Sequence, residues 1–195
     1  MEITFQKATL NDLVAIKEIY DYYITQTNAT FHTDPISFEE LREMIPFYHK
    51  KYPSFLVKAD GKTAGYCYLS SFKNRQAYDR TAEITVYLKA EYCGQGIGYK
   101  TVKYLEDVAQ KRGIKVLVGT ITGTNENSIR LFARCGFEKC AHYKQVGQKF
   151  DELLDIYFSF FSTERIIYYP YEYFKNDSSL IYNKIQQKLN LSQDD

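Results

Sequence analysis

The sequence predicts an α/β (α+β) fold in which one mixed central sheet is flanked by helices. Segments with strand-like patterns alternate with segments whose apolar residues recur every three or four positions, as in amphipathic helices. The chain has 195 residues, 45% of them hydrophobic and 25% charged, which suits the packed core of one globular domain. We therefore expect one domain over residues 1–161 and a Tyr-rich extension with a short helix over residues 162–195.

The first part of the chain predicts one strand and two helices. Residues 2–8 form the strand, and a helix capped by Thr9 or Asn11 follows, with regularly spaced apolar residues. Ser37 and Glu40 have the spacing of a capping box, so a second helix begins there.

The middle of the chain predicts three strands and a long helix. Two apolar runs flank Asp60 and Gly61, a dipeptide typical of a tight hairpin turn. Residues 81–90 are rich in β-branched and aromatic residues, which favours a third strand. The segment 92–113 passes from a glycine-rich loop into an amphipathic helix that ends at Gly113.

The last part of the predicted domain contains a strand, a helix and two further strands. Residues 114–121 have the apolar pattern of a buried strand. Residues 125–135 form a helix that is closed by Gly136, and the final strands cover residues 137–146 and 151–161.

Charge and cysteine content exclude several classes of function. Lys and Arg total 25 and Asp and Glu total 24, so no basic surplus is available for binding nucleic acid. No apolar run is long enough to span a membrane, and charged residues interrupt the N-terminal segment where a secretory signal would be apolar. The four cysteines lack C-x-x-C spacing, so we expect a reduced cytoplasmic protein without a metal site.

The glycine-rich loop Cys93–Gly98 is the clearest candidate for a ligand site. Gly94, Gly96 and Gly98 alternate between a predicted strand and a predicted helix. Glycine allows close approach of the backbone, and free amides at a helix N-terminus bind phosphate. The spacing matches neither the dinucleotide-binding nor the nucleoside-triphosphate motif. A phosphate-bearing cofactor and a purely structural turn both remain open at this point.

Together with TAEITVYL before it and NENSIRLFARCGF after it, this loop resembles the GNAT superfamily of acetyl-CoA-dependent N-acyltransferases. In that superfamily a [Gln/Arg]-x-x-Gly-x-[Gly/Ala] pattern holds the coenzyme A pyrophosphate; Gly96 and Gly98 match its glycines, whereas Cys93 replaces the Gln or Arg. Asn125 matches an Asn that touches the pantetheine arm. The resemblance implies acetyl-CoA contacts at Val86, Tyr87, Leu88, Gly94, Gln95, Gly96, Ile97, Gly98, Tyr99, Asn125 and Ser128.

A narrower resemblance comes from four separated segments in one order: TNATFHTDPIS, SFKNRQAYDRTAEITVYL, NENSIRLFARCGF and VGQKFDELLD. They are similar to the phosphinothricin N-acetyltransferase family, and the similarity covers residues 3–161. The resemblance implies acetylation of the α-amino group of a small amino acid analogue of the phosphinothricin, methionine sulfoximine or methionine sulfone type. It also implies a homodimer.

Glu83 is the candidate catalytic residue. Strand alternation places it on one face with Thr85 and Tyr87, while Ala82, Ile84, Val86 and Leu88 lie on the other face. A solvent-facing strand residue would show the same pattern, but Glu83 coincides with the general base of the family. It would take a proton from the substrate ammonium. The backbone N–H of Val86 would stabilise the oxyanion if the strand splays as the resemblance implies.

Phe132 occupies the position where relatives carry a Tyr or His as general acid, and Phe cannot donate a proton. A general acid contributes about 10²- to 10⁴-fold, least where the leaving group is already good. A thiol of pKa about 8.5 leaves readily as thiolate. Two explanations stay open: Tyr143 or water replaces the acid, or the substrate differs.

For the acceptor, Arg75 is the candidate partner of a substrate carboxylate because its guanidinium binds carboxylates bidentately. An exposed loop arginine is the alternative. The resemblance implies that Lys149 and Phe150 reach the pocket of a neighbouring subunit. Three aromatic residues would wall the pocket: Phe31, Phe72 and Tyr78.

Two other functions remain as alternatives. One is a protein or peptide N-acetyltransferase, although the balanced charge argues against strongly cationic acceptors. The other is a non-catalytic acyl-CoA-binding module, which the departures at Cys93 and Phe132 would explain.

Overall fold

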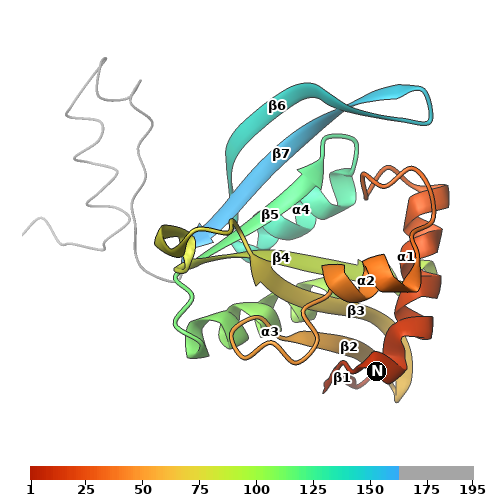
Figure 1. Cartoon of the computed structure of the whole chain (residues 1–195), viewed down its shortest axis with the longest axis vertical. Coiled ribbons are helices and arrows are strands. Elements are labelled where there is room, and N and C mark those ends of the chain that lie inside the picture. Colours follow the sequence, from red (N-terminus) through yellow and green to blue (C-terminus); the bar gives the residue numbers. More distant parts are fainter. Residues whose placement is uncertain (163–195) are drawn as a thin grey trace, which may run out of the picture. The chain divides into compact units, whose positions relative to one another are not determined.

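The computed structural model describes residues 1–162, which form a seven-stranded mixed sheet with helices on both faces (Figure 1). The predicted fold class and order of elements are confirmed. The predicted helix in residues 162–195 lies outside the described residues. The helices and strands are β1 (Ile3–Lys7), α1 (Leu13–Gln26), α2 (Phe38–Met44), β2 (Ser54–Ala59), β3 (Lys62–Ser71), β4 (Thr81–Leu88), α3 (Ile97–Lys111), β5 (Val116–Thr122), α4 (Glu126–Cys135), β6 (Glu138–Lys149) and β7 (Glu152–Ser162).

The strand order is β1-β2-β3-β4-β5-β7-β6, and one pair of central strands is parallel. Strands β1 to β4 pair as antiparallel neighbours, and so do β5, β7 and β6. The turn between β2 and β3 has positive φ at Asp60 (46°) and Gly61 (78°), as a two-residue hairpin requires. The parallel pair β4–β5 ends at Glu83 and Val118, although both strands continue beyond these residues. The sheet therefore opens in its middle.

The two faces of the sheet carry two separate cores. Helices α3 and α4 cover one face with mainly aliphatic contacts, among them Val102, Leu105 and Leu117. Helices α1 and α2 cover the other face, where Tyr20, Tyr66 and other phenols are packed among Ile and Leu side chains. The alternation predicted for β4 is confirmed, because Ala82, Ile84 and Leu88 belong to the α3–α4 core whereas Tyr87 packs against the α1–α2 core.

Local signals place most helix ends where the sequence predicts them. Ser37 and Glu40 form the expected capping box, and Gly136 closes α4 with φ 95°. The first helix differs slightly from the prediction. A 3-10 turn, Leu10–Asp12, follows Thr9 before α1 begins, since Asp12 returns its carboxylate to the Thr9 backbone N–H at 2.8 Å.

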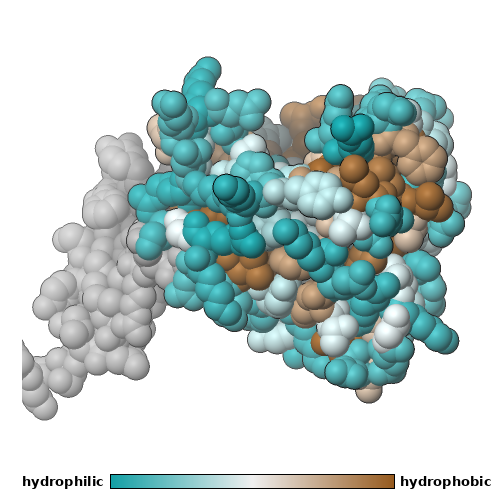
Figure 2. Space-filling model, turned by 60° about the horizontal axis from the view of Figure 1, so that its bottom comes forward, coloured by the Kyte–Doolittle hydropathy of each residue, from teal (hydrophilic) through white to brown (hydrophobic). Residues whose placement is uncertain are grey.

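The long β6–β7 hairpin, cyan and blue in Figure 1, exposes large apolar side chains. Tyr143, Val146, Phe150 and Leu153 are all more than half exposed. In the face drawn in Figure 2, the surface is mainly hydrophilic and the hydrophobic residues gather toward one side. Among the helices that the structure describes, none is long and apolar enough to cross a membrane.

Candidate active site

The opening between β4 and β5 is the centre of a cleft of about 1080 Å³. Its walls come from segments that are far apart in the sequence: the loop after α1, residues 83–88 of β4, the glycine loop and α4. The volume is of the size expected for a large ligand. The cleft thus lies where the paired part of β4 and β5 ends.

The backbone of β4 directs hydrogen-bond donors into this opening. The N–H of Lys89 donates to the carbonyl of Ala64 at 2.8 Å, which continues the ladder with β3. Because N–H groups alternate in direction along an antiparallel strand, those of Val86 and Leu88 point away from β3. Pairing with β5 has already ended at Glu83. The N–H of Val86 is therefore aimed between the two diverging strands.

Glu83 lies at the inner end of the cleft, on the α1–α2 face of β4. The hydroxyl of Thr120 on β5 donates to Glu83 Oε1 at 2.6 Å, so the carboxylate is held across the opening. On the other side, Ser70 of β3 is its cross-strand neighbour and also lines the cleft. The sequence analysis missed Thr120, since the bond joins residues 37 positions apart.

The glycine loop forms the other end of the cleft. Gly94 and Gly96 have φ of 75° and 77°, and Gly96 is the N-cap of α3. This conformation is costly for residues with a Cβ, which explains the glycines. Gly98 faces α4 so closely that a Cβ there would lie 3.0 Å from Leu131. The loop thus presents free backbone amides at the start of α3, the arrangement that binds phosphate.

Helix α4 adds cations that the sequence analysis did not single out. Arg130 and Arg134 both line the cleft, and the Arg134 guanidinium lies 5.0 Å from the ring centre of Tyr99. Asn125 caps α4 by accepting a bond from the Ser128 N–H at 3.1 Å. Arg130 is already paired with Glu126 at 2.9 Å. Backbone amides with Arg134 near the glycine loop, and the Glu83 carboxylate elsewhere in the cleft, suit a long ligand with phosphates at one end only.

Most of the predicted cofactor residues line this cleft, with two exceptions. The Ile97 side chain is buried in the α3–α4 core, and the Gln95 side-chain amide donates to the Glu91 carbonyl at 2.6 Å. The spacing of apolar residues along α3 predicts that the Ile97 side chain points into the core. The predicted residues that the structure brings together around the cleft are Phe31, Glu83, Val86, Tyr87, Leu88, Gly94, Gly96, Gly98, Tyr99, Asn125 and Ser128.

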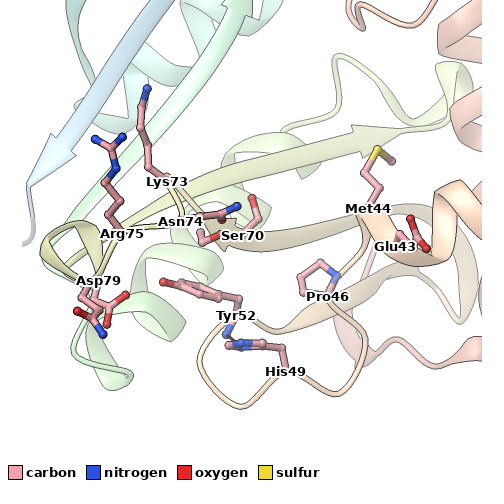
Figure 3. A pocket seen from close by; sticks show the side chains of 12 residues that line it. Glu43, Met44, Pro46, His49, Tyr52, Ser70, Lys73, Asn74, Arg75 and Asp79 are labelled. Atoms are coloured by element: carbon pink, nitrogen blue, oxygen red, sulfur yellow. Dashed lines mark hydrogen bonds between the residues drawn. The ribbon is translucent and has the colours of Figure 1, made fainter.

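Arg75 lines a second, smaller hollow of about 380 Å³. This hollow and the cleft share Met44 and Ser70, so it adjoins the Glu83 end. In Figure 3, Lys73 and Arg75 extend side by side from the loop after β3, away from Tyr52. Both cations therefore lie next to the Glu83 end of the cleft, and Lys73 was not predicted.

Of the other predicted acceptor residues, Phe31 lines the cleft, and the remaining four lie outside both hollows. Phe72 and Tyr78 pack against each other edge to face, 5.9 Å between ring centres. Phe150 is exposed at the β6–β7 turn. Lys149 is only 3% exposed, and its ammonium donates to the Thr30 carbonyl of the same chain at 3.0 Å. Its side chain thus points into its own domain.

Phe132 is a core residue as well as part of the cleft wall. Its ring packs edge to face on Phe137, with 4.8 Å between the ring centres. The ring also lies so close to Gly119 that a Cβ at that position would be only 2.6 Å from Phe132. Tyr143, the predicted substitute acid, packs on Phe158 of the hairpin and is not among the cleft residues. The phenol of Tyr23, by contrast, lies in the cleft wall and donates to the Leu88 carbonyl at 2.6 Å.

Comparison with known proteins identifies the fold and the kind of chemistry. The family described as Acetyltransferase (GNAT) domain matches residues 5–157. The phosphinothricin N-acetyltransferase of Streptomyces coelicolor is 30% identical over 159 residues, 80% of this chain and 93% of that protein. The L-methionine sulfoximine/L-methionine sulfone acetyltransferase of Salmonella typhimurium is 32% identical over 162 residues, 80% of this chain and 92% of that protein.

A solved structure extends the similarity to three dimensions. The phosphinothricin acetyltransferase of Sinorhizobium meliloti, in complex with acetyl-CoA, superposes with a TM-score of 0.76 and 30% identity. The match covers 83% of this chain and 89% of that one. The resemblance predicted from the four sequence segments is confirmed.

Proposed function

Because this chain belongs to the GNAT acetyltransferase family, we propose that it transfers the acetyl group of acetyl-CoA to the α-amino group of a small amino acid or analogue. Candidate acceptors are of the phosphinothricin, methionine sulfoximine and methionine sulfone type, since those are the substrates in the names of its relatives. The observation that carries the proposal is Glu83 at the inner end of a cleft that has phosphate-binding amides at its other end.

The glycine loop and α4 would hold the phosphates of the cofactor. Free N–H groups at Gly96 and Gly98 lie at the start of α3 beside the cleft, and Arg134 adds positive charge, whereas Arg130 is paired with Glu126. The cofactor supplies a thioester, an acyl group that amines can attack. These residues thereby fix the depth to which the acyl end reaches between β4 and β5.

Glu83 would act as general base, because only a neutral amine attacks a thioester. Its carboxylate is oriented by the Thr120 hydroxyl and receives the ammonium proton directly or through water. The N–H of Val86 points into the opening and donates to the oxyanion of the tetrahedral intermediate. Collapse of the intermediate breaks the carbon–sulfur bond and expels a thiolate, which takes the second amine proton as the amide forms. A thiol of pKa about 8.5 needs little help from an acid, so Phe132 is compatible with turnover.

Arg75 would hold the acceptor carboxylate from the adjoining hollow. The acceptor amine is then near Glu83, and its body lies over Ser70 and Met44, the two residues that both hollows share. Lys73 lies beside Arg75 and strengthens the attraction for anions (Figure 3). This arrangement selects acceptors that carry a carboxylate close to the reacting amine.

The test is release of free coenzyme A thiol from acetyl-CoA with a panel of amino acids and analogues, with product identification by mass spectrometry. We expect turnover with at least one α-amino acid analogue and a product mass increased by one acetyl group. Turnover with peptides alone would favour the alternative, a peptide N-acetyltransferase. The 380 Å³ hollow is the observation in favour of that alternative, because it leaves room beyond one residue.

We also propose that the enzyme works as a homodimer through its β6–β7 hairpin. Large apolar side chains on that hairpin, including Val146 and Leu153, are more than half exposed, which is typical of surfaces that associate. Light scattering coupled to size exclusion should give twice the chain mass of 22.9 kDa. A mass of one chain at micromolar concentration would contradict the dimer and leave the chemistry unaffected.

A further inference from the structure

Lys149, near the end of β6, is a buried cation whose ammonium binds backbone carbonyls. It is 3% exposed and donates to the carbonyls of Thr30 at 3.0 Å and Tyr23 at 3.5 Å. Tyr23 lies in the last turn of α1, where the helix dipole is negative. Burying a charge is costly unless it is well paired, and burial lowers the pKa of Lys149. The two carbonyls that pair with the buried ammonium offset this cost, so the Lys149 side chain is held in a fixed position.

The Thr30 carbonyl that Lys149 holds belongs to a segment that walls the cleft, and the Tyr23 carbonyl lies in the helix just before that segment. All residues from Thr27 to Phe31 line the cleft, as does Tyr23. The segment has no helix or strand of its own, so its position depends on contacts with other elements. In Figure 1 it follows α1 and rises on the same side as the turn between β6 and β7.

Two further contacts tie the same segment to this part of the sheet. The Thr122 hydroxyl, at the end of β5, donates to the Asn28 carbonyl at 2.5 Å. The ring of Phe31 lies against Gly147 of β6, where a Cβ would be 3.5 Å from the ring. Phe31 is directly after Thr30, so the Lys149 bond holds the backbone beside an aromatic side chain that faces the cleft.

We propose that Lys149 is a positioning residue that fixes residues 27–31, and with them Phe31, against the β6–β7 hairpin of the same chain and so sets the acceptor side of the cleft. This role replaces the expectation that Lys149 enters a neighbouring subunit's pocket. It rests on the proposed function only in that the cleft receives an amine acceptor. The two bonds of the Lys149 ammonium go to Tyr23 and Thr30 and not to the glycine loop or α4, so their loss should leave the cofactor end of the cleft in place.

The test compares Lys149→Met with Lys144→Met, a lysine to methionine change on the same strand at an exposed position. Loss of bonds from a charged donor should raise the acceptor KM of Lys149→Met about tenfold or more. We expect the acetyl-CoA KM to change less than about twofold. Lys149→Arg, which keeps a cationic donor, should recover part of the loss. An unchanged acceptor KM, or equal increases for both substrates, would overturn the proposal.

A second measurement separates this proposal from the proposed function. Hydrogen exchange of residues 27–31 needs no substrate and should become faster in Lys149→Met but not in Lys144→Met. Thr122→Val removes another hydrogen bond to the same segment with little change in side-chain volume, and it should also accelerate exchange there. This variant keeps the test available if Lys149→Met does not fold. Unchanged exchange in the folded variants contradicts the tether even if the enzyme is active. Faster exchange of residues 27–31 in Lys149→Met, together with no turnover of any amine by the wild type, would contradict the proposed function and leave the role of Lys149 intact.

Discussion

The two faces of the sheet contribute to the cleft in different ways. On the α3–α4 side, the glycine loop presents backbone N–H groups at the start of α3, and the side chains of Tyr99 and Arg134 lie beside them. On the α1–α2 side, the wall is made of side chains, with Tyr23, Tyr68 and Glu83 among them. Backbone donors suit phosphates whatever the neighbouring side chains are. Acceptor recognition therefore depends on side chains, and this side is the one where exchange of single residues can change the substrate.

The phosphate side also comes from two short stretches of sequence, whereas the acceptor side is assembled from many. Residues 94–99 and 125–128 supply most of the former. The latter draws on the segment after α1, on Met44 of α2, on Ser70 of β3 and on Glu83 of β4. Contiguous residues form a motif that can be recognised in the sequence, whereas residues that come together from distant segments form no such motif.

Glu83→Gln is the change with the largest expected effect, and it tests whether the acceptor side performs the chemistry. The amide keeps the volume and an acceptor for the Thr120 hydroxyl but cannot take a proton. We expect kcat to fall about 10²- to 10⁴-fold, the usual contribution of a general base. Steady-state kinetics on the best acceptor measures this. Acetyl-CoA affinity, measured by calorimetry, should stay within about twofold of the wild type.

Wild-type rates in Glu83→Gln would show that the enzyme does not use this carboxylate as its base. Acetyl-CoA binding without turnover in either protein would support the alternative of a non-catalytic acyl-CoA-binding module. Thr120→Val is the matched control for orientation alone, because it removes the hydroxyl that holds Glu83 Oε1 and leaves the carboxylate in place. Its loss in kcat should be smaller than that of Glu83→Gln.

The phenols of the α1–α2 core should make the protein sensitive to alkali. Tyr66 is 1% exposed, and within residues 1–162 its hydroxyl has no hydrogen-bond partner. Burial raises the pKa of the Tyr66 phenol well above its ordinary value of 10.0. The folded chain keeps that proton above pH 10 while the unfolded chain loses it, so the free energy of unfolding falls as pH rises.

Tyr66→Phe should therefore stabilise the fold, most strongly in alkali. Removing an unpaired buried hydroxyl should add about 1 kcal/mol at pH 7. The gain should grow by about 1.4 kcal/mol for each pH unit above 10. Urea unfolding at pH 7 and pH 11 measures both values. Tyr143→Phe, which changes an exposed phenol on the β6–β7 hairpin, is the control that should change neither. A constant difference between the two pH values would contradict the linkage.

Arg75→Ala tests whether the smaller hollow belongs to the acceptor side. Loss of a charge-assisted bond should raise the acceptor KM about tenfold, while the acetyl-CoA KM stays nearly constant. Lys73→Ala, next to it in Figure 3, should have a smaller effect because an ammonium cannot bind bidentately. Both KM values are measured with the assay of coenzyme A thiol release. Equal increases in both KM values would show that Arg75 acts on the cofactor.

The contrast between the two sides explains what the sequence could predict. Strand alternation is local, so it placed Glu83 on the correct face of β4. The bonds of Lys149 join residues 119 and 126 positions apart, and no local pattern marks such partners. Ile97 was assigned to the cofactor from its neighbours in the glycine loop. Its side chain is the first of the buried stripe of α3, while its backbone N–H is among the free amides at the start of that helix. There the helix periodicity decided the side-chain direction.

Gly96→Ala is expected to have the smallest effect, and it tests whether the phosphate side depends on backbone conformation. Gly113→Ala is its matched control, because the two glycines have φ of 77° and 73° and open space around the Cβ position. Each substitution should cost about 1–2 kcal/mol of stability from the left-handed conformation. Only Gly96 lines the cleft, so only Gly96→Ala should weaken acetyl-CoA binding, by about fivefold, as its amide and those that follow shift. Equal affinities of the two variants by calorimetry would mean that the arginines of α4, rather than the loop, hold the phosphates.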